Sequence, residues 1–140
     1  MSPKAPGNSG VPLVRKLGII EGSAVVLRRA PAGYFDWLGP LPLGVQFLED
    51  ISIRVDIVHL FCDTRSVLKA ELESLRGSIR SDAAIWVSWP KRSSGAPTDI
   101  SDDAIRELAI PLGFVDVKVC AVSEVWSALK LVIRKELRKS

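Results

Sequence analysis

The chain has 140 residues, which favours one domain, and its 47% hydrophobic and 25% charged content is ordinary for a globular protein. No apolar run reaches the ~18 residues of a membrane span, and the start of the chain lacks an apolar signal-peptide core. With two cysteines, one histidine and no C-x-x-C motif, the sequence predicts reduced thiols in a cytoplasmic protein and excludes a Cys/His metal site.

The net charge of +3 is concentrated at the ends of the chain. Residues 134–140 carry a net charge of +3 and residues 1–14 carry +1, so the body between them is close to −1. A nucleic-acid-binding protein usually spreads basic residues over a folded face. The sequence therefore favours a solvated tail over a nucleic-acid interface, and weak binding of anions or nucleic acids through the tail is kept as an alternative.

The first segment, residues 1–12, is rich in Ser, Pro, Gly and Asn and predicts a disordered leader. A single α/β domain is expected over residues 13–136, followed by a frayed basic tail at 137–140. Within the domain, residues 23–28 and 45–48 predict two short strands. One or two helical turns between them are expected to end at a Gly/Pro-rich stretch.

The middle of the chain predicts two further strands, each followed by a helix. Residues 55–61 form a strongly apolar strand, and 66–80 carry the single apolar stripe of a helix. Residues 83–89 are almost continuously apolar, which is typical of a strand buried on both faces. Residues 101–112 predict a second helix, which Ser101 can cap.

The last section alternates apolar and polar residues. In the segment 115–121, Val115, Val117 and Val119 are expected on one face of a strand. Residues 129–134 alternate in part. Because the join between these segments is too short for a helical crossover, they should form an antiparallel hairpin.

Right-handed crossovers then predict a three-layer, Rossmann-like α/β fold with a mostly parallel sheet of about six strands, in the order 2-1-3-4-6-5. This order, with its final antiparallel pair, is similar to the S-adenosylmethionine methyltransferase fold without its third strand. The chain also carries, over about residues 15–137, the segments Lys16-Leu-Gly-Ile, Ala30-Pro-Ala-Gly, Gly39-Pro-Leu-Pro, Trp86-Val-Ser-Trp-Pro-Lys91, Asp116-Val-Lys-Val-Cys-Ala-Val122 and Trp126-Ser-Ala-Leu-Lys-Leu-Val-Ile-Arg134. In these it resembles an uncharacterised bacterial family of short proteins, a domain of unknown function that implies no activity.

The loop after the predicted strand 83–89 is the first candidate site. It offers two cations and two hydroxyls, Lys91, Arg92, Ser93 and Ser94, before a glycine. Such a loop at the carboxyl end of a strand can bind a phosphate or a carboxylate. The alternative is an exposed polar loop without a ligand.

The loop after the first strand is the second candidate. A dinucleotide or S-adenosylmethionine site needs glycines there, and this loop has only Gly33. Arg28 and Arg29 stand where methyltransferases place an acidic residue and a glycine. The loop is therefore either a structural turn or a site for an anion, and Tyr34 and Trp37 are candidates to line a pocket mouth.

Three acidic residues complete the candidates. Glu49 or Asp50 after the second strand can bind ribose hydroxyls, and Asp63 after the third can hold a ligand amine or cap the next helix. His59, in the middle of an apolar strand, is expected to be buried and hydrogen-bonded rather than a catalytic base. No motif positions a catalytic set of residues, so none is predicted.

These observations favour a non-catalytic Rossmann-like binding or interaction module, working as a homodimer or with a protein partner through an edge strand. The alternative is a minimal S-adenosylmethionine-dependent methyltransferase or a small-nucleotide-binding enzyme. That alternative implies S-adenosylmethionine as the cofactor and a small anionic or adenosyl ligand. The sequence argues against a nucleic-acid or membrane partner.

Overall fold

The structure, a computed structural model, describes residues 11–138. Residues 1–10 of the predicted leader and 139–140 of the predicted tail lie outside this range. The strands are β1 (Ala24–Arg28), β2 (Gln46–Leu48), β3 (Ile57–Phe61), β4 (Ala84–Pro90), β5 (Phe114–Ala121) and β6 (Trp126–Ile133). The helices are α1 (Leu13–Lys16), α2 (Tyr34–Leu38), α3 (Arg65–Arg76) and α4 (Asp102–Ala109), with 3-10 turns η1 (Arg92–Ser94), η2 (Ile110–Leu112) and η3 (Lys135–Leu137).

The six strands form one sheet in the order β2-β1-β3-β4-β6-β5, which confirms the predicted topology. β1 pairs in parallel with β2 and β3, and β3 with β4. β6 is antiparallel to both β4 and β5. The chain therefore leaves β1 toward one side, forms β2, and returns across β1 to form β3.

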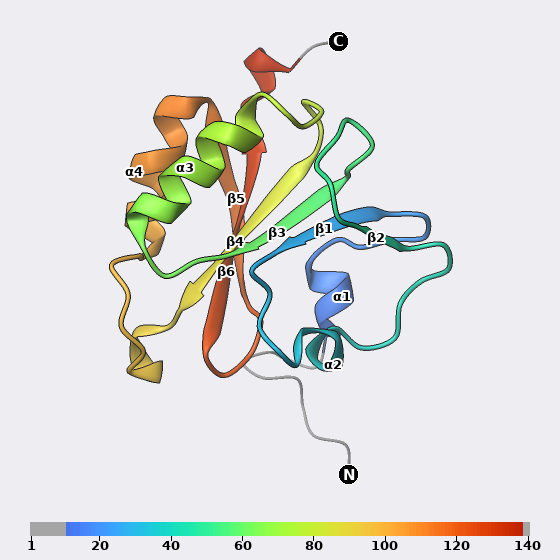
Figure 1. Cartoon of the computed structure of the whole chain (residues 1–140), viewed down its shortest axis with the longest axis horizontal. Coiled ribbons are helices and arrows are strands. Elements are labelled where there is room, and N and C mark those ends of the chain that lie inside the picture. The colour runs from blue at the N-terminus through green and yellow to red at the C-terminus, as the bar shows by residue number, and fades with distance from the viewer. Residues whose placement is uncertain (1–10, 139–140) are drawn as a thin grey trace.

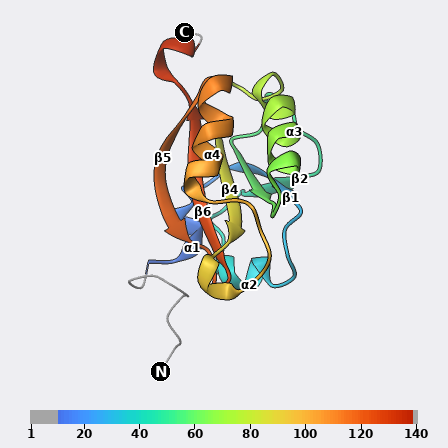
Figure 2. The same cartoon turned by 90° about the vertical axis from the view of Figure 1, so that its left-hand side faces the viewer.

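Helices cover both faces of the sheet, as the predicted three layers require (Figure 1). α3 and α4 lie side by side on one face, over a core cluster that includes Leu72, Ile85 and Leu129. α1 and α2 belong to a second cluster on the other face, with Tyr34 and Trp86. Every residue of β4 is buried, which confirms the expected burial on both faces. Figure 2 shows β5 at the outer edge of the sheet.

The link between β2 and β3 contains no helix. It crosses β1 on the α3 face, where Ile51 packs against the core. None of the helices in residues 11–138 is long and apolar enough to span a bilayer.

The caps of α3 and α4 follow the expected chemistry with one correction. Ser101 Oγ accepts a hydrogen bond from the Ala104 N–H at 3.1 Å, as predicted. At α3 the cap is Thr64, whose hydroxyl accepts from the Val67 N–H at 3.4 Å. Capping by the Asp63 side chain is therefore wrong, because the helix begins one residue too late for it, and that carboxylate is left to the solvent.

The outer strand β5 departs from its predicted alternation. Val115 lies opposite Val132 and Val119 opposite Leu129, with a register shift around Val117. Because Leu129 and Val132 are three positions apart on β6, an odd step, Val115 and Val119 face opposite sides of the sheet. The prediction of three valines on one face is wrong, and all three are exposed, by 37–59%.

Candidate functional site

A small pocket lies where the carboxyl ends of β1 and β3 meet. We call it the carboxyl-edge pocket; its volume is about 180 Å³ and its lining is Arg29, Phe61, Cys62, Asp63, Val67 and Trp126. Arg29 follows β1, Phe61 ends β3 with residues 62 and 63 just after it, and Trp126 begins β6. Trp126 is held against the Phe61 ring, with their centroids 5.0 Å apart in an edge-to-face arrangement.

The position of this pocket is set by the topology. β1 connects to β2 on one side and lies beside β3 on the other, so the direction of winding reverses between β1 and β3. Loops leaving two such strands diverge and leave a crevice, in which open α/β sheets bind their ligands. The carboxyl-edge pocket occupies that crevice.

The loop after β1 is fastened to α3. Arg28 Nη1 lies 3.3 Å from Glu71 Oε1, and Arg29 Nε lies 3.8 Å from Glu71 Oε2. A second pocket of about 280 Å³ lies beside this contact and shares Arg29 and Val67 with the first. The Arg29 side chain, 56% exposed, lines both.

The backbone of this loop is unusual at two positions. Among residues 11–138, Arg29 is the single non-glycine residue with a positive φ, at 61°. Gly33 has a φ of 95°, and a Cβ there would touch the Trp37 ring at 3.5 Å. Residues other than glycine rarely adopt a positive φ, and such backbone conformations are more frequent at ligand-binding sites.

Tyr34 lies in the core instead of at a pocket mouth, which corrects its predicted place. It is 2% exposed, and its hydroxyl lies 2.8 Å from His59 Nδ1. His59 Nε2 lies 2.7 Å from Ser88 Oγ, so three buried side chains form one hydrogen-bonded chain through α2, β3 and β4. Tyr34 is buried because the helical turn of α2 points its ring at the sheet. The expected buried, hydrogen-bonded His59 is confirmed.

Burial keeps the hydrogen-bonded side chains of Tyr34 and His59 uncharged. Desolvation lowers the pKa of His59 to about 3 and raises the pKa of Tyr34 well above its ordinary value. Cys62 at the carboxyl-edge pocket is also affected, because burial and the neighbouring Asp63 raise the pKa of its thiol to about 12. At neutral pH its thiol is protonated and therefore a poor nucleophile.

The loop predicted as the first candidate site, Lys91–Ser94, contains the 3-10 turn η1, and Lys91 is the residue just before it. Ser94 Oγ donates to the Lys91 carbonyl at 2.7 Å, so this hydroxyl stabilises its own turn. The Lys91 N–H donates to the Val125 carbonyl at 2.7 Å. Arg92 and Ser93 are exposed. These residues line neither pocket at this edge, and their role in binding stays a prediction.

The predicted acidic residues are separated. Asp63 lines the carboxyl-edge pocket, and its carbonyl accepts from the Thr98 hydroxyl at 2.8 Å. Glu49 is exposed and lines neither pocket at this edge. The reason is register: β2 ends at Leu48 opposite Val26, two residues before β1 ends.

Several lining residues were not predicted as part of a site: Phe61, Cys62, Val67 and Trp126. The end of the predicted third strand is a signal that could have found Phe61 and Cys62, since ligands bind at the carboxyl ends of parallel strands. Within residues 11–138, no three His, Cys, Asp or Glu side chains gather as a metal site.

No model of a known protein family matches the sequence, and no curated protein matches it by sequence. Solved structures match in fold. TrmN from Thermus thermophilus aligns with 87% of this chain at a TM-score of 0.54 and 12% identity, and the chain spans 47%, about half, of TrmN. A putative type 11 methyltransferase from Sulfolobus solfataricus aligns with 84% of the chain and 88% of its own length, with a TM-score of 0.56 and 10% identity.

Fibrillarin from Aeropyrum pernix, solved with natively bound S-adenosyl-L-methionine, gives a TM-score of 0.56 at 10% identity. That alignment covers 81% of this chain and 68% of fibrillarin. At such identities the likeness shows the fold alone: a Rossmann-like sheet of the methyltransferase type. Membership of the uncharacterised bacterial family stays a prediction.

Proposed function

We propose that this chain is a methyltransferase-like domain that binds an adenosyl ligand, S-adenosylmethionine, in the carboxyl-edge pocket. One observation carries the proposal: the pocket lies at the carboxyl ends of β1 and β3, where the winding of the sheet reverses. The fold likeness to methyltransferases supports it, and one of those structures holds S-adenosylmethionine. This support moves our preference from the non-catalytic module to the methyltransferase-like alternative.

The lining offers groups for each part of such a ligand. Asp63 supplies a carboxylate for an amine or for ribose hydroxyls, and Arg29 supplies a cation for the ligand carboxylate. Phe61 and Trp126 supply an aromatic wall for a base. When bound, S-adenosylmethionine would bring an electrophilic methyl group. Cys62 is a poor acceptor for that group, because its thiol stays protonated at neutral pH.

The size of the site depends on Arg29. Ligand pockets usually measure about 300–1,000 Å³, and the two pockets at this edge are smaller, at about 180 and 280 Å³. Both are lined by Arg29, whose contact with Glu71 is long, at 3.8 Å. Arg28 keeps its own contact with Glu71, at 3.3 Å, so the half-exposed Arg29 side chain can move without leaving the buried Glu71 carboxylate unpaired. We propose that this movement joins the two pockets around the ligand.

Binding without turnover is the second candidate. Arg28 and Arg29 replace the acidic residue and glycine expected after β1, and both arginines contact Glu71. A loop of this kind favours an anion over the cationic centre of S-adenosylmethionine. The product S-adenosylhomocysteine, which lacks that cationic centre, would then bind at least as tightly, and no methyl group would be transferred.

A thermal-shift titration with S-adenosylhomocysteine tests the proposal, with ATP and NAD as comparisons. A ligand at a hundred times its Kd stabilises a fold by about 2.7 kcal/mol, which raises the Tm measurably. Asp63→Asn should weaken binding, since the Asp63 carboxylate lines the pocket while its carbonyl, which the substitution keeps, makes the contact with Thr98. Glu73→Gln on the exposed side of α3 is the matched control and should bind normally.

Asp63→Asn is a cleaner probe than a substitution of Gly33. Because Gly33 has a φ of 95°, any side chain there strains the start of α2 whether or not a ligand binds. A saturable shift with S-adenosylhomocysteine that Asp63→Asn weakens would support the proposal. Absence of a shift, or an equal shift in both variants, would contradict it and return the non-catalytic module with a protein partner to first place.

A further inference from the structure

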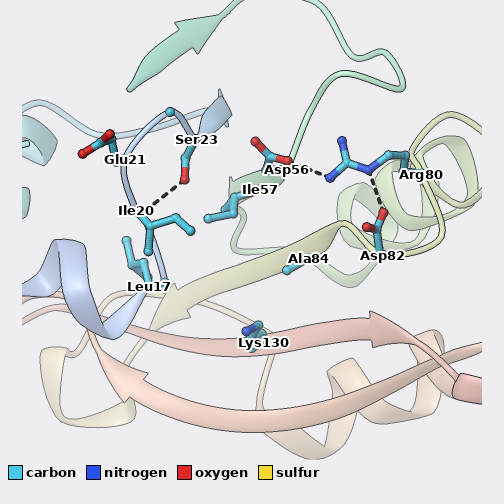
Figure 3. A pocket seen from close by; sticks show the side chains of 12 residues that line it. Leu17, Ile20, Glu21, Ser23, Asp56, Ile57, Arg80, Asp82, Ala84 and Lys130 are labelled. Atoms are coloured by element: carbon cyan, nitrogen blue, oxygen red, sulfur yellow. Dashed lines mark hydrogen bonds and ion pairs between the residues drawn. The ribbon is translucent and has the colours of Figure 1, made fainter. Parts of the chain in front are cut away.

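A larger pocket lies at the opposite edge of the sheet, before the strands begin. We call it the amino-edge pocket; its volume is about 400 Å³, within the range of small-ligand sites. The segment from Leu17 to Ser23 forms one wall, and the starts of β3 and β4 form another. Lys130 of β6 completes the lining (Figure 3).

One wall of the amino-edge pocket is formed by Arg80, Asp56 and Asp82, which pair with one another. Arg80 Nη2 lies 2.7 Å from Asp56 Oδ1, and Arg80 Nε lies 2.6 Å from Asp82 Oδ1. The remaining Arg80 nitrogen donates to the Ile53 carbonyl at 3.0 Å. The second Asp56 oxygen accepts from the Ala24 N–H at 2.8 Å. This group fixes the starts of β1, β3 and β4, and each of the three Arg80 nitrogens already has a protein partner.

Lys130 is different, because its charge is not compensated. It is half-buried, and within residues 11–138 its ammonium group makes no hydrogen bond or ion pair (Figure 3). Its direct neighbour across the β5–β6 pair is another cation, Lys118. Burial and this neighbour both lower the pKa of Lys130. Like charges directly opposite one another destabilise a sheet, so an anion placed beside Lys130 would relieve this repulsion.

The other lining groups indicate what kind of anion would compensate Lys130. Leu17, Ile20 and Ile57 give the pocket apolar walls. Three carboxylates in the lining, including Glu21, outnumber its two cations. The resulting net charge of −1 opposes a polyanion such as a phosphate ester. Because Arg80 is paired with Asp56 and Asp82, Lys130 is the lining cation that can pair with a ligand, which limits the ligand to a single negative charge on an apolar body.

We propose that the amino-edge pocket binds a small apolar monocarboxylate, whose carboxylate pairs with Lys130 and whose apolar body contacts Leu17, Ile20 and Ile57. A simple carboxylic acid and an apolar α-amino acid share this chemistry. They differ in the ammonium group, which the exposed carboxylate of Glu21 favours. The site is separate from the carboxyl-edge pocket, so this proposal does not depend on whether the adenosyl ligand binds.

Isothermal titration calorimetry with 4-methylpentanoate and with leucine tests this proposal. Lys130→Met keeps the length of the side chain and removes its charge, so we expect at least a tenfold loss of affinity. Lys118→Met is the matched control: it removes the same charge from the same face of the hairpin but lies outside the pocket lining. It should keep the wild-type affinity. The uncharged 4-methylpentanamide should bind at least tenfold more weakly than the acid.

Tighter binding of leucine would identify a zwitterion as the ligand class, and tighter binding of 4-methylpentanoate would identify a simple acid; both support the site if the affinity depends on Lys130. No saturable binding of either up to about 10 mM would overturn the proposal, as would equal affinities of Lys130→Met and wild type. Lys130→Met should fold, since it removes an unpaired cation. Unchanged binding of S-adenosylhomocysteine in this variant would separate the two sites.

Discussion

His59 should make this fold less stable as the pH falls from about 7.5 to about 5. It is the one histidine of the chain. In the fold it is fully buried between Tyr34 and Ser88, and burial lowers its pKa to about 3. In the unfolded chain the pKa returns to about 6.5. Between these values the unfolded state binds a proton that the folded state does not, so the free energy of unfolding decreases as the pH falls below 6.5.

The size of the effect follows from the two pKa values. Each pH unit below 6.5 lowers the free energy of unfolding by about 1.36 kcal/mol, which gives about 2 kcal/mol between pH 7.5 and pH 5. Burial opposes the shift at Asp56, but the hydrogen bond from the Ala24 N–H and the contact with Arg80 lower its pKa. Arg80 lowers the pKa of Asp82, and Arg106 lowers the pKa of Asp116. Their stabilisation is present above the unfolded pKa of about 3.9 and is lost only as the pH falls through it, outside this range.

Urea unfolding followed by tryptophan fluorescence, at several pH values between about 5 and 7.5, measures this dependence. His59→Gln removes the titrating group and should remove the dependence. Ser88→Ala keeps His59 but deletes one partner, so it should unfold more easily at every pH and keep the wild-type slope. A wild-type protein equally stable at both ends of the range would refute the reasoning, as would a slope that survives in His59→Gln.

Three further predictions concern local structure. Gly113→Ala should destabilise by more than about 1 kcal/mol in urea unfolding, since φ is 101° and a Cβ would lie 2.9 Å from a side-chain carbon; Gly77→Ala, in open space, should be nearly neutral. Thr64→Ala should cost about 1 kcal/mol by the same measurement through the lost cap of α3, whereas Asp63→Asn should leave stability unchanged. Cys62 should react slowly with a thiol reagent at neutral pH until the chain is unfolded, because its pKa is raised to about 12; rapid labelling of the folded protein would contradict its burial.

The topology could be predicted because its signals are local and strong. The uninterrupted apolar segment at β4 requires burial on both faces, and Leu68, Leu72 and Leu75 recur at helical spacing and are at most 1% exposed. The short join before β6 permits only a hairpin, and the antiparallel pair is observed. These patterns, with right-handed crossovers, leave few sheet orders to choose between.

Three features were not predicted: the register shift in β5, the short helix α1 and the residues that meet in the carboxyl-edge pocket. The register shift around Val117 changes which face of β5 each later side chain occupies, and alternation in the sequence cannot show it. The short helix α1 has no periodic pattern of its own, and its Leu13 is buried against the sheet. The carboxyl-edge pocket brings together Arg29, Asp63 and Trp126, which are far apart in the sequence. No local sequence motif could therefore predict it.

The loop after β1 also shows how a loop with a single glycine can be held in place beside a pocket. In glycine-rich loops, backbone freedom lets the chain approach a ligand. Here side chains fix the loop from both faces of the sheet: Tyr34 is bonded to His59 on one face, and Arg28 contacts Glu71 on the other. Between these anchors Arg29 is held at a φ of 61°, at the rim of the pocket. The absence of a G-x-G motif therefore does not exclude a ligand here, because a buried polar chain and an ion pair hold the loop in place.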